Sequence, residues 1–245
     1  MGSTYNSKYK YKIDKLLAII LLLILLPILL LILIILIIEL KSNPIIIQKR
    51  GLSLNNSCFR IYKFRTLKKF PKQNYQTDNV FYKTELLEYV SRFGSWLRHT
   101  GLDELPQLLN IIKGEMSFVG PRPFMIEDLQ RIKEKNPEAY KIRDCLSSKP
   151  GLTGRWQVFG DRHNGIDDLI FHEKLYDSEI SFKNDFRIFI ATIPLVFKGK
   201  LSDAILNGSS RKNIIKNQKI NSISKIGEYL NIFYFGIILS LFLTF

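Results

Sequence analysis

Cysteine and histidine are scarce in this chain, and their positions exclude two common kinds of site. The two cysteines, Cys58 and Cys145, show no metal-ligand spacing, and two thiols do not make a disulfide framework. The three histidines share no spacing that would bring them together on one metal ion. We therefore expect two inert thiols on the reducing side of a membrane.

Glycine-rich nucleotide loops and internal repeats are also missing from the sequence. No stretch matches a Walker-type phosphate loop or the glycine pattern of a dinucleotide-binding fold. The segment from Gly151 to Gly154 predicts only a turn when it is considered by itself. The sequence therefore gives no support to a P-loop enzyme or to a dinucleotide-dependent enzyme.

Acidic residues are few relative to basic ones. The chain has 22 Asp and Glu against 36 Lys and Arg, which gives a formal charge of +14. Such a balance predicts anionic partners, such as nucleic acid, anionic lipid or phosphorylated substrates. Lysine, isoleucine and asparagine are abundant throughout, so part of the excess reflects compositional bias. The positions of the arginines are therefore more informative than the total charge.

Charged residues are absent from one long segment near the N-terminus. Residues 16–38 contain only Leu, Ile, one Ala and one Pro, and a lysine-rich stretch precedes them. About 20 apolar residues suffice to span a bilayer. A signal peptide would have a shorter apolar core and a small-residue cleavage site, whereas this run ends in Glu39-Leu40-Lys41. We therefore expect residues 1–43 to form a basic N-terminus and a retained membrane helix.

Pro27 lies at the middle of that run and should kink or break the helix, because it lacks an N–H and crowds the preceding turn. One interpretation is a kinked span, and the other is a re-entrant hairpin that enters and leaves on the same face. Basic residues stand on both flanks, which suits one cytoplasmic side for both ends. The residues alone leave both interpretations open.

The rest of the pattern predicts an α+β catalytic domain, mostly helical, over residues 44–206. Two short strands are expected within residues 44–66, joined by a turn at 55–57. Helices are predicted from Thr84 to Gly101 and at 103–113, 126–135, 168–176 and 185–197, with a rigid loop at 118–123. A polar linker at 207–228 leads to the apolar segment 229–245, which is either a short span or an interfacial helix.

Two adjacent acids, Asp103 and Glu104, form the first candidate site. Both should lie in the first turn of a helix, where Pro106 is tolerated, and an acidic first turn by itself is an ordinary helix start. A helix N-terminus also attracts phosphate and keeps Asp103 ionised, so that this carboxylate could attack a phosphoryl group. Glu104 could hold Mg²⁺, which prefers carboxylate and phosphate oxygens.

Four basic residues are candidates for binding phosphate. Arg98 lies about one helical turn before the acids, Arg122 is held between two prolines, and Lys63 and Arg65 project from the same face of a strand. Guanidinium forks match phosphate oxygens in a bidentate way. Each of these residues alone would usually be a solvated surface charge, but their grouping beside prolines and aromatic residues indicates a phosphate site.

Five sequence blocks occur in order and carry a family resemblance. They are QKRG at 48–51, FRIYKFRT at 59–66, RFGSWLRHTGLDELPQLLNIIK at 92–113, GEMSFVGPRP at 114–123 and KPGLTGRWQV at 149–158. Over residues 10–200 the chain resembles the bacterial sugar transferase family, also called monotopic phosphoglycosyl transferases. A single block could arise by chance, whereas five in this order identify the family.

The resemblance implies a membrane enzyme whose Asp103 attacks the β-phosphate of a UDP-sugar and releases UMP. A polyprenyl phosphate of the undecaprenyl type then accepts the phosphosugar, with Mg²⁺ bound by Glu104. Arg98 and Arg122 match the family's phosphate and nucleotide contacts. The product would feed downstream glycosyltransferases in exopolysaccharide or lipopolysaccharide biosynthesis, and nucleic acid is not an expected partner.

The resemblance also implies a re-entrant helix broken at Pro27, with the catalytic domain on the cytoplasmic face of the bacterial inner membrane. Two departures concern this geometry and the substrate contacts. Leu26 stands where the family usually has a Ser before the proline, and Glu173 stands where it often has an Asp. We expect Glu173 to contact substrate in place of that Asp.

A second hypothesis is a non-catalytic membrane protein whose basic surface binds anionic lipid or nucleic acid. It predicts basic residues spread over one face and no special role for acids. The transferase hypothesis instead makes Asp103 and Glu104 indispensable. Turnover of a UDP-sugar to UMP separates the two hypotheses.

Overall fold

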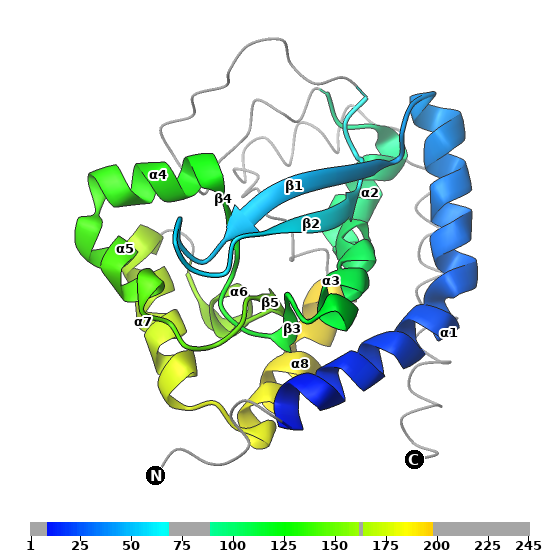
Figure 1. The fold of residues 1–245 in the computed structure, drawn as a ribbon. Helices are drawn as coiled ribbons and strands as arrows, with labels where there is room; N and C mark the ends of the chain where they lie inside the picture. Colours follow the sequence, from blue (N-terminus) through cyan, green and yellow to red (C-terminus); the bar gives the residue numbers. More distant parts are fainter. Residues whose placement is uncertain (1–8, 69–88, 162–163, 198–245) are drawn as a thin grey trace. The chain divides into compact units, whose positions relative to one another are not determined.

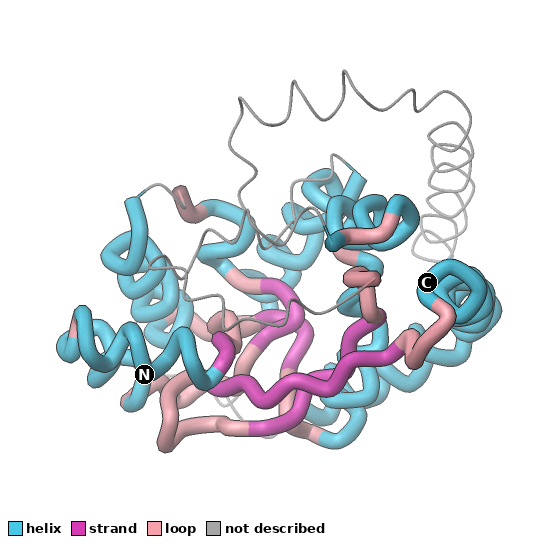
Figure 2. The backbone as a smooth tube through the Cα atoms, turned by 90° about the horizontal axis from the view of Figure 1, so that it is seen from above, coloured by secondary structure: helices cyan, strands magenta, loops and turns pink. Residues whose placement is uncertain are grey.

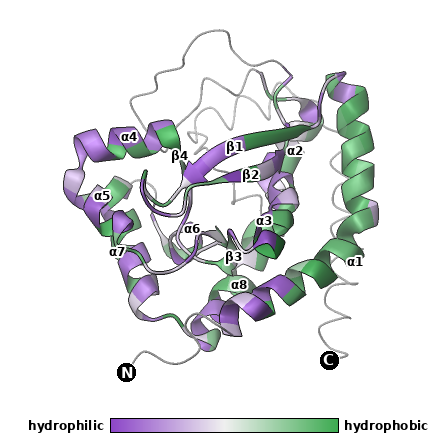
Figure 3. Ribbon diagram, viewed as in Figure 1, coloured by the Kyte–Doolittle hydropathy of each residue, from purple (hydrophilic) through white to green (hydrophobic). Residues whose placement is uncertain are grey.

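The apolar run forms helix α1, Tyr9–Leu40, in the computed structural model (Figure 1), which describes residues 9–68, 89–161 and 164–197. Most of α1 is hydrophobic, and by length and composition it could cross a membrane (Figure 3). The helix stays continuous through Pro27 and bends along its length (Figure 1). The interruption expected at Pro27 is therefore wrong, because α1 is a single continuous helix with Pro27 inside it. A proline removes one hydrogen bond, and the other bonds of the helix persist around it.

The two halves of α1 pack on different parts of the same catalytic unit. Near its N-terminus, Lys10 Nζ lies 2.5 Å from the Asp185 carboxylate, and Ser117 donates a hydrogen bond to Asp14. In its second half, Leu36 and neighbouring residues pack with Phe64 in an apolar cluster. The remaining apolar side chains of α1 are largely exposed.

The first two strands form an antiparallel pair, as the sequence predicts. Strand β1, Ile45–Gly51, pairs with β2, Phe59–Phe64, in the register that sets Ile45 opposite Phe64. The short strand β4, Phe124–Met125, pairs antiparallel with the other edge of β1. Alternation of buried and exposed residues places Phe59, Ile61 and Lys63 of β2 on its buried face.

A second sheet was not predicted. Strand β3, Ser117–Val119, pairs in parallel with β5, Gly151–Thr153, so that the expected loop at 118–123 and the expected turn at 151–154 each contain strand residues. These strands are three residues long, too short to show an alternating pattern in the sequence. Figure 2 shows the strands in the middle of the described part, with helices around them.

The helices that precede the dyad differ from their predicted bounds. Helix α2 spans Arg92–Thr100, and Ser91 caps it by accepting a hydrogen bond from the N–H of Gly94. Val90 instead forms an isolated bridge with Leu67, so the helix does not extend back through it, and Thr84 lies outside the described residues. A Ser at the N-cap satisfies an otherwise unpaired N–H of the first turn, which fixes the start.

The predicted helix 103–113 divides into two elements. A 3₁₀ helix, η3, spans Leu102–Gln107, and helix α3 follows as Leu108–Lys113. Gly101 before η3 has φ 71°, a left-handed conformation that favours glycine, and it turns the chain sharply between α2 and η3. Pro106 lacks the N–H that an α-helical bond would use, which favours the tighter 3₁₀ form at this point.

The C-terminal half of the catalytic unit is helical. It comprises α4 (Ile126–Lys135), α5 (Pro137–Asp144), α6 (Arg155–Phe159), α7 (Gly165–Ser178) and α8 (Phe182–Phe197). Helices α4, α7 and α8 match predicted ones, although α7 and α8 begin three residues earlier. Helices α5 and α6 were not predicted. The mostly helical α+β class is confirmed, whereas the segments 207–228 and 229–245 lie outside the described residues.

Candidate active site

The acidic dyad lies at the start of η3, directly beside strand β2. Glu104 Oε1 is 2.5 Å from the Nζ of Lys63, which projects from the buried face of β2. The same oxygen is 3.8 Å from Nη2 of Arg122, which follows β3. Three of the residues predicted for the site are thus brought together from three separate segments. Asp103 is the preceding residue of η3 and is half-buried.

Arg98 and Arg65 are both held against the segment that follows β2. Arg98 Nε donates a 2.6 Å hydrogen bond to the hydroxyl of Thr66. Arg65 Nε donates to the carbonyl of Leu67 at 2.9 Å. Arg98 belongs to α2, and α2 packs against η3, which carries the dyad. The hydrogen bond from Arg98 to Thr66 therefore holds α2 against the end of β2.

Glycines let the loop that carries Arg122 lie directly on the neighbouring loop. The N–H of Gly120 donates to Thr153 O at 3.0 Å, and the N–H of Gly151 donates to Pro121 O at 2.9 Å. A Cβ added to Gly120 would lie 2.2 Å from Lys149 O, and one added to Gly151 would lie 2.1 Å from Gly120 N. The close approach therefore requires glycine at both positions, and it fixes the backbone from which Arg122 projects.

Glu173 of α7 is buried and stabilises the loop that carries Arg122. Its carboxylate accepts a 3.1 Å hydrogen bond from the N–H of Arg122 and forms an ion pair with Arg143 of α5. Arg143 in turn donates to Arg122 O at 2.7 Å and to Leu52 O at 2.8 Å. Glu173, expected to contact substrate, is 2% exposed, and its carboxylate is engaged by the Arg122 N–H and by Arg143.

Burial raises the pKa of the Glu173 carboxyl, and the Arg143 guanidinium opposes that rise. The side chain of Arg143 is fully buried, and it also lies over the Phe124 ring at 4.7 Å. Removing either member of a buried ion pair leaves the other charge uncompensated, so the two residues depend on each other.

Sequence reasoning missed Arg143. In the sequence it occurs between Lys141 and Asp144 and looks like one charge among many on a polar segment. Its burial follows from the docking of α5 against α7 and against the loop after β1, which no local pattern reveals. The signal that could have found it is co-variation with position 173, which a single sequence does not contain.

The donor set suits a hard divalent cation only in part. In the described ranges, no group of three or more His, Cys, Asp or Glu side chains could enclose a metal ion. Mg²⁺ usually binds through one or two carboxylates together with substrate phosphates. Glu104 fits that arrangement, because both of its ion pairs use Oε1 and Oε2 takes part in neither.

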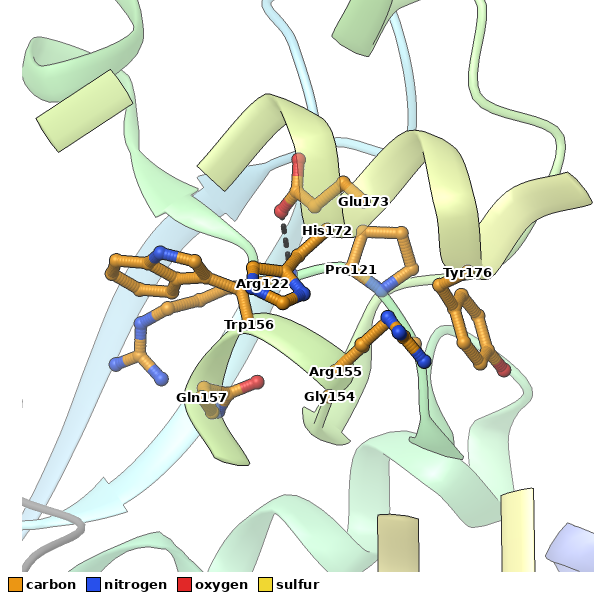
Figure 4. A pocket seen from close by; sticks show the side chains of 10 residues that line it. Pro121, Arg122, Gly154, Arg155, Trp156, Gln157, His172, Glu173 and Tyr176 are labelled. Atoms are coloured by element: carbon orange, nitrogen blue, oxygen red, sulfur yellow. Dashed lines mark hydrogen bonds between the residues drawn. The ribbon is translucent and has the colours of Figure 1, made fainter. Parts of the chain in front are cut away.

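A small pocket opens on the other side of the Arg122 loop. Residues 120–122, 154–157, His172, Glu173 and Tyr176 line it (Figure 4). Burial and the charge of Arg155 lower the pKa of His172, and Asp168, 3.6 Å from its Nε2, partly offsets this effect. The site as a whole therefore combines an acidic dyad, two cations beside it and a polar pocket behind the loop.

Such an arrangement is suited to phosphoryl transfer. Carboxylates can serve as nucleophile and metal ligand, while the cations stabilise charge on the transferred group. The chain belongs to the bacterial sugar transferase family, whose sequence profile matches residues 5–199.

Three relatives illustrate the match. The galactosyl transferase CpsE of Streptococcus agalactiae is 33% identical over 171 residues, 66% of this chain and 36% of the relative. The exopolysaccharide production protein ExoY of Sinorhizobium fredii is 38% identical over 158 residues, 60% of this chain and 67% of the relative. The UDP-glucose:undecaprenyl-phosphate glucose-1-phosphate transferase of Escherichia coli is 30% identical over 164 residues, 66% of this chain and 34% of the relative. The match thus spans about a third of CpsE and of the Escherichia coli protein.

Proposed function

We propose that this protein transfers a sugar-1-phosphate from a UDP-sugar to a polyprenyl phosphate, yielding a polyprenyl-diphospho-sugar and UMP. The observation that carries the proposal is the convergence of Lys63 and Arg122 on the dyad residue Glu104. The Escherichia coli relative is named for this reaction with UDP-glucose and undecaprenyl phosphate. The product would be the first membrane-bound intermediate of a polysaccharide or glycoconjugate.

The transfer takes place in two displacements at phosphorus. An oxygen of Asp103 forms a bond to the β-phosphorus, the bond from that phosphorus to the bridging oxygen breaks, and UMP leaves with the electron pair. An oxygen of the polyprenyl phosphate then bonds to the same phosphorus, and the Asp103 carboxylate leaves. A covalent intermediate suits one soluble and one membrane-dissolved substrate, because the enzyme need not hold both together.

The cations beside the dyad have defined tasks in this proposal. Lys63 and Arg122 offset the repulsion between the diphosphate and the Asp103 carboxylate and stabilise charge on the transferred phosphoryl group. Arg98 is expected to add a further phosphate contact. Glu104 would hold Mg²⁺, which when bound neutralises phosphate charge and orients the diphosphate.

We also propose that α1 is re-entrant, so that both of its ends lie on the cytoplasmic face with the catalytic domain. The support is that Lys10 is bound by Asp185 of α8, while Glu39 accepts a hydrogen bond from the N–H of Phe93 in α2. Helices α2 and α8 contact each other. A straight 32-residue helix would be about 48 Å long, so ends held this way favour the bent form.

The test of the reaction is intact-mass analysis of purified protein incubated with a UDP-sugar alone. We expect a mass increase of one sugar-phosphate on the wild type, accompanied by UMP release, and no adduct on Asp103→Asn. Polyprenyl phosphate added afterwards should remove the adduct. Kinetics that require both substrates before any UMP is released, with no adduct, would overturn the mechanism.

The test of topology is accessibility labelling of single cysteines introduced at positions 5 and 42. The native thiols, Cys58 and Cys145, are both exposed, so they are replaced by serine in the single-cysteine variants, and the unmodified protein labelled in parallel reports the side on which they lie. We expect positions 5 and 42 to label from that same side in sealed vesicles. Labelling from opposite sides would show that α1 crosses the bilayer.

A further inference from the structure

Strand β2 carries Lys63 to the dyad, and one edge of this strand has no strand beside it. In the described part of the chain the sheet order is β2-β1-β4, so β2 pairs with β1 on one side only. The other edge contacts α3, which follows η3 directly in the chain. Backbone groups at this edge need other partners, because an unpaired buried N–H or C=O is costly.

The side chain of Asn110 in α3 supplies such partners. Its Oδ1 accepts a 3.2 Å hydrogen bond from the N–H of Tyr62, and its Nδ2 donates to Arg60 O at 2.7 Å. The second proton of Nδ2 goes to Oε2 of Glu115, also at 2.7 Å. Asn110 is 0% exposed. Two acceptors and one N–H surround its amide, so the oxygen and the nitrogen have one arrangement that satisfies all three contacts.

The two bonds to β2 reproduce the pattern of a neighbouring strand. A residue of a parallel strand accepts from one residue of its neighbour and donates to the residue two positions earlier, which here are Tyr62 and Arg60. The amide of Asn110 therefore sets one register of α3 against β2. Ile61, Leu108 and Ile111 belong to one apolar cluster, but apolar contacts are non-directional and would tolerate a shift.

These bonds join the two segments that form the Lys63–Glu104 pair. Lys63 is the residue after Tyr62, and its Nζ lies 2.5 Å from Glu104 Oε1. Glu104 belongs to η3, which continues directly into α3. A slip of α3 along β2 by one residue would move the two segments by about 3.3 Å relative to each other. Such a slip would separate the cation from the dyad, so the register that Asn110 sets also sets this pair.

We propose that Asn110 is a positioning residue of the transfer reaction, which holds Lys63 at the place beside the dyad that the reaction needs. This inference rests on the proposed function, because it concerns the cation assigned to the transferred phosphoryl group. Asn110 is fully buried, so it acts through β2 and α3 rather than on the substrate. A misplacement of about 1 Å in a reacting site can cost about 10²-fold in rate.

The first test is a double-mutant cycle between Asn110→Leu and Lys63→Met, measured as kcat for UMP release from a radiolabelled UDP-sugar. Leucine has the branched shape of asparagine and no hydrogen-bonding group. We expect Asn110→Leu to lower kcat by about 30-fold when Lys63 is present and by less than about threefold in the Lys63→Met protein. Equal losses in the two backgrounds would overturn the proposal.

Asn56→Leu is the matched control. Asn56 Nδ2 donates to two backbone carbonyls, Asp144 O at 3.1 Å and Leu146 O at 3.0 Å, so it forms the same kind of bridge. It lies in the turn between β1 and β2, at the end of the strand pair away from Lys63. Its effect on kcat should be the same with and without Lys63. Coupling of Asn56 to Lys63 as strong as that of Asn110 would overturn the proposal, because any loss of stability would then reach the site.

The second test does not depend on activity. Hydrogen–deuterium exchange is followed for the backbone amide of Tyr62 by mass spectrometry with fragmentation. Asn110→Leu removes the acceptor of this N–H, so its exchange should be about tenfold faster than in the wild type. Asn56→Leu should leave the rate within about twofold of the wild type. Unchanged exchange in Asn110→Leu would show that the amide does not hold β2 and would overturn the proposal.

Failure of this inference is distinguishable from failure of the proposed function. If the wild type releases UMP from none of UDP-glucose, UDP-galactose and their N-acetylamino counterparts, the proposed reaction is wrong, while the exchange rates still decide whether Asn110 holds β2. If UMP is released and the cycle is additive, only the positioning role is wrong.

A second variant keeps the test decisive should Asn110→Leu fail to fold. Asn110→Asp combined with Glu115→Gln exchanges donor and acceptor across that contact and keeps the acceptor for the N–H of Tyr62. It loses the bond to Arg60 O. The same cycle with Lys63→Met then applies: a smaller loss of kcat without Lys63 supports the proposal, and equal losses overturn it.

Discussion

Glu104 and Glu173 are both glutamates paired with cations, yet their surroundings differ. The Glu104 side chain is 17% exposed and meets Lys63 and Arg122 at the edge of the site. The Glu173 side chain is 2% exposed, and its partner Arg143 is fully buried. The Lys63 and Arg122 side chains are 9% and 10% exposed, so the Glu104 pairs are less deeply buried than the Glu173 pair, and breaking the fully buried pair leaves the more costly uncompensated charge. The first pair thus suits chemistry and the second suits structure.

The largest effect should come from the acid next to Glu104. Asp103→Asn keeps the size of the side chain but gives a poor nucleophile, so UMP release should fall by at least about 10³-fold. Chemical unfolding in detergent should stay close to that of the wild type, because Asp103 is half-buried at the site's edge. Residual activity within tenfold of the wild type would leave Asp103 as an ordinary helix-start residue.

Glu173→Gln tests the buried side of the comparison. It leaves the Arg143 charge without an anion at 0% exposure, so the free energy of unfolding should fall by about 3–5 kcal/mol. Activity should fall as well, since Arg143, which also donates to Arg122 O, loses the anion that holds it in place. Glu179→Gln, exposed at the end of the same helix, is the control. Equal stability of the two variants would contradict the structural role of Glu173.

Compared with Glu173→Gln, the variant Glu104→Gln should lose more activity and less stability. UMP release should fall by roughly 10²-fold through the loss of electrostatic stabilisation and metal binding, with a higher Mg²⁺ requirement. Its destabilisation should be smaller than that of Glu173→Gln, because the Glu104 pairs are nearer to solvent. Removal of divalent cations by exhaustive chelation should abolish wild-type turnover. Activity that survives chelation would remove the metal from the mechanism.

Local sequence patterns predicted the parts of this site that have local causes. The β1–β2 pair and helix α4 follow from alternation and helical periodicity, and Lys63, Glu104 and Arg122 were singled out by their charge and setting, whereas their convergence from three segments is a property of the fold. The sequence offers both Thr84 and Ser91 as N-cap residues, and helical periodicity does not distinguish them. The structure shows that Ser91 is the cap, so α2 begins at Arg92. The 3₁₀ form of η3 depended on Gly101 and Pro106 acting together.

Features that depend on distant contacts were not predictable. Strands β3 and β5 exist because Gly120 and Gly151 allow two loops to touch, and the partner of each is remote in sequence. The Arg143–Glu173 and Lys10–Asp185 pairs join residues 30 and 175 positions apart. In the sequence, the residues of these buried pairs look like ordinary surface charges, so only the fold shows that they are paired.

The smallest effect concerns the pH dependence of stability in the pocket. His172 has a pKa lowered from the usual 6.5, mainly by burial, and Arg155 adds to the lowering while Asp168 opposes it. A lowered pKa means that the stabilising contribution of neutral His172 is fully present above pH 6.5. It is lost as the pH falls from 6.5 through the folded-state pKa, because the unfolded chain binds the proton more readily.

His172→Leu removes this titration and should therefore lose less stability than the wild type over the same fall in pH. The measurement is the free energy of unfolding at pH values on both sides of 6.5 for the wild type, His172→Leu and Lys174→Ala. Lys174→Ala should parallel the wild type, since it retains His172. Only the difference between the curves matters, because the raised pKa values of Glu173 and Asp185 act with the opposite sign in all three proteins. If the His172→Leu curve runs parallel to that of the wild type below pH 6.5, burial does not hold the imidazole neutral.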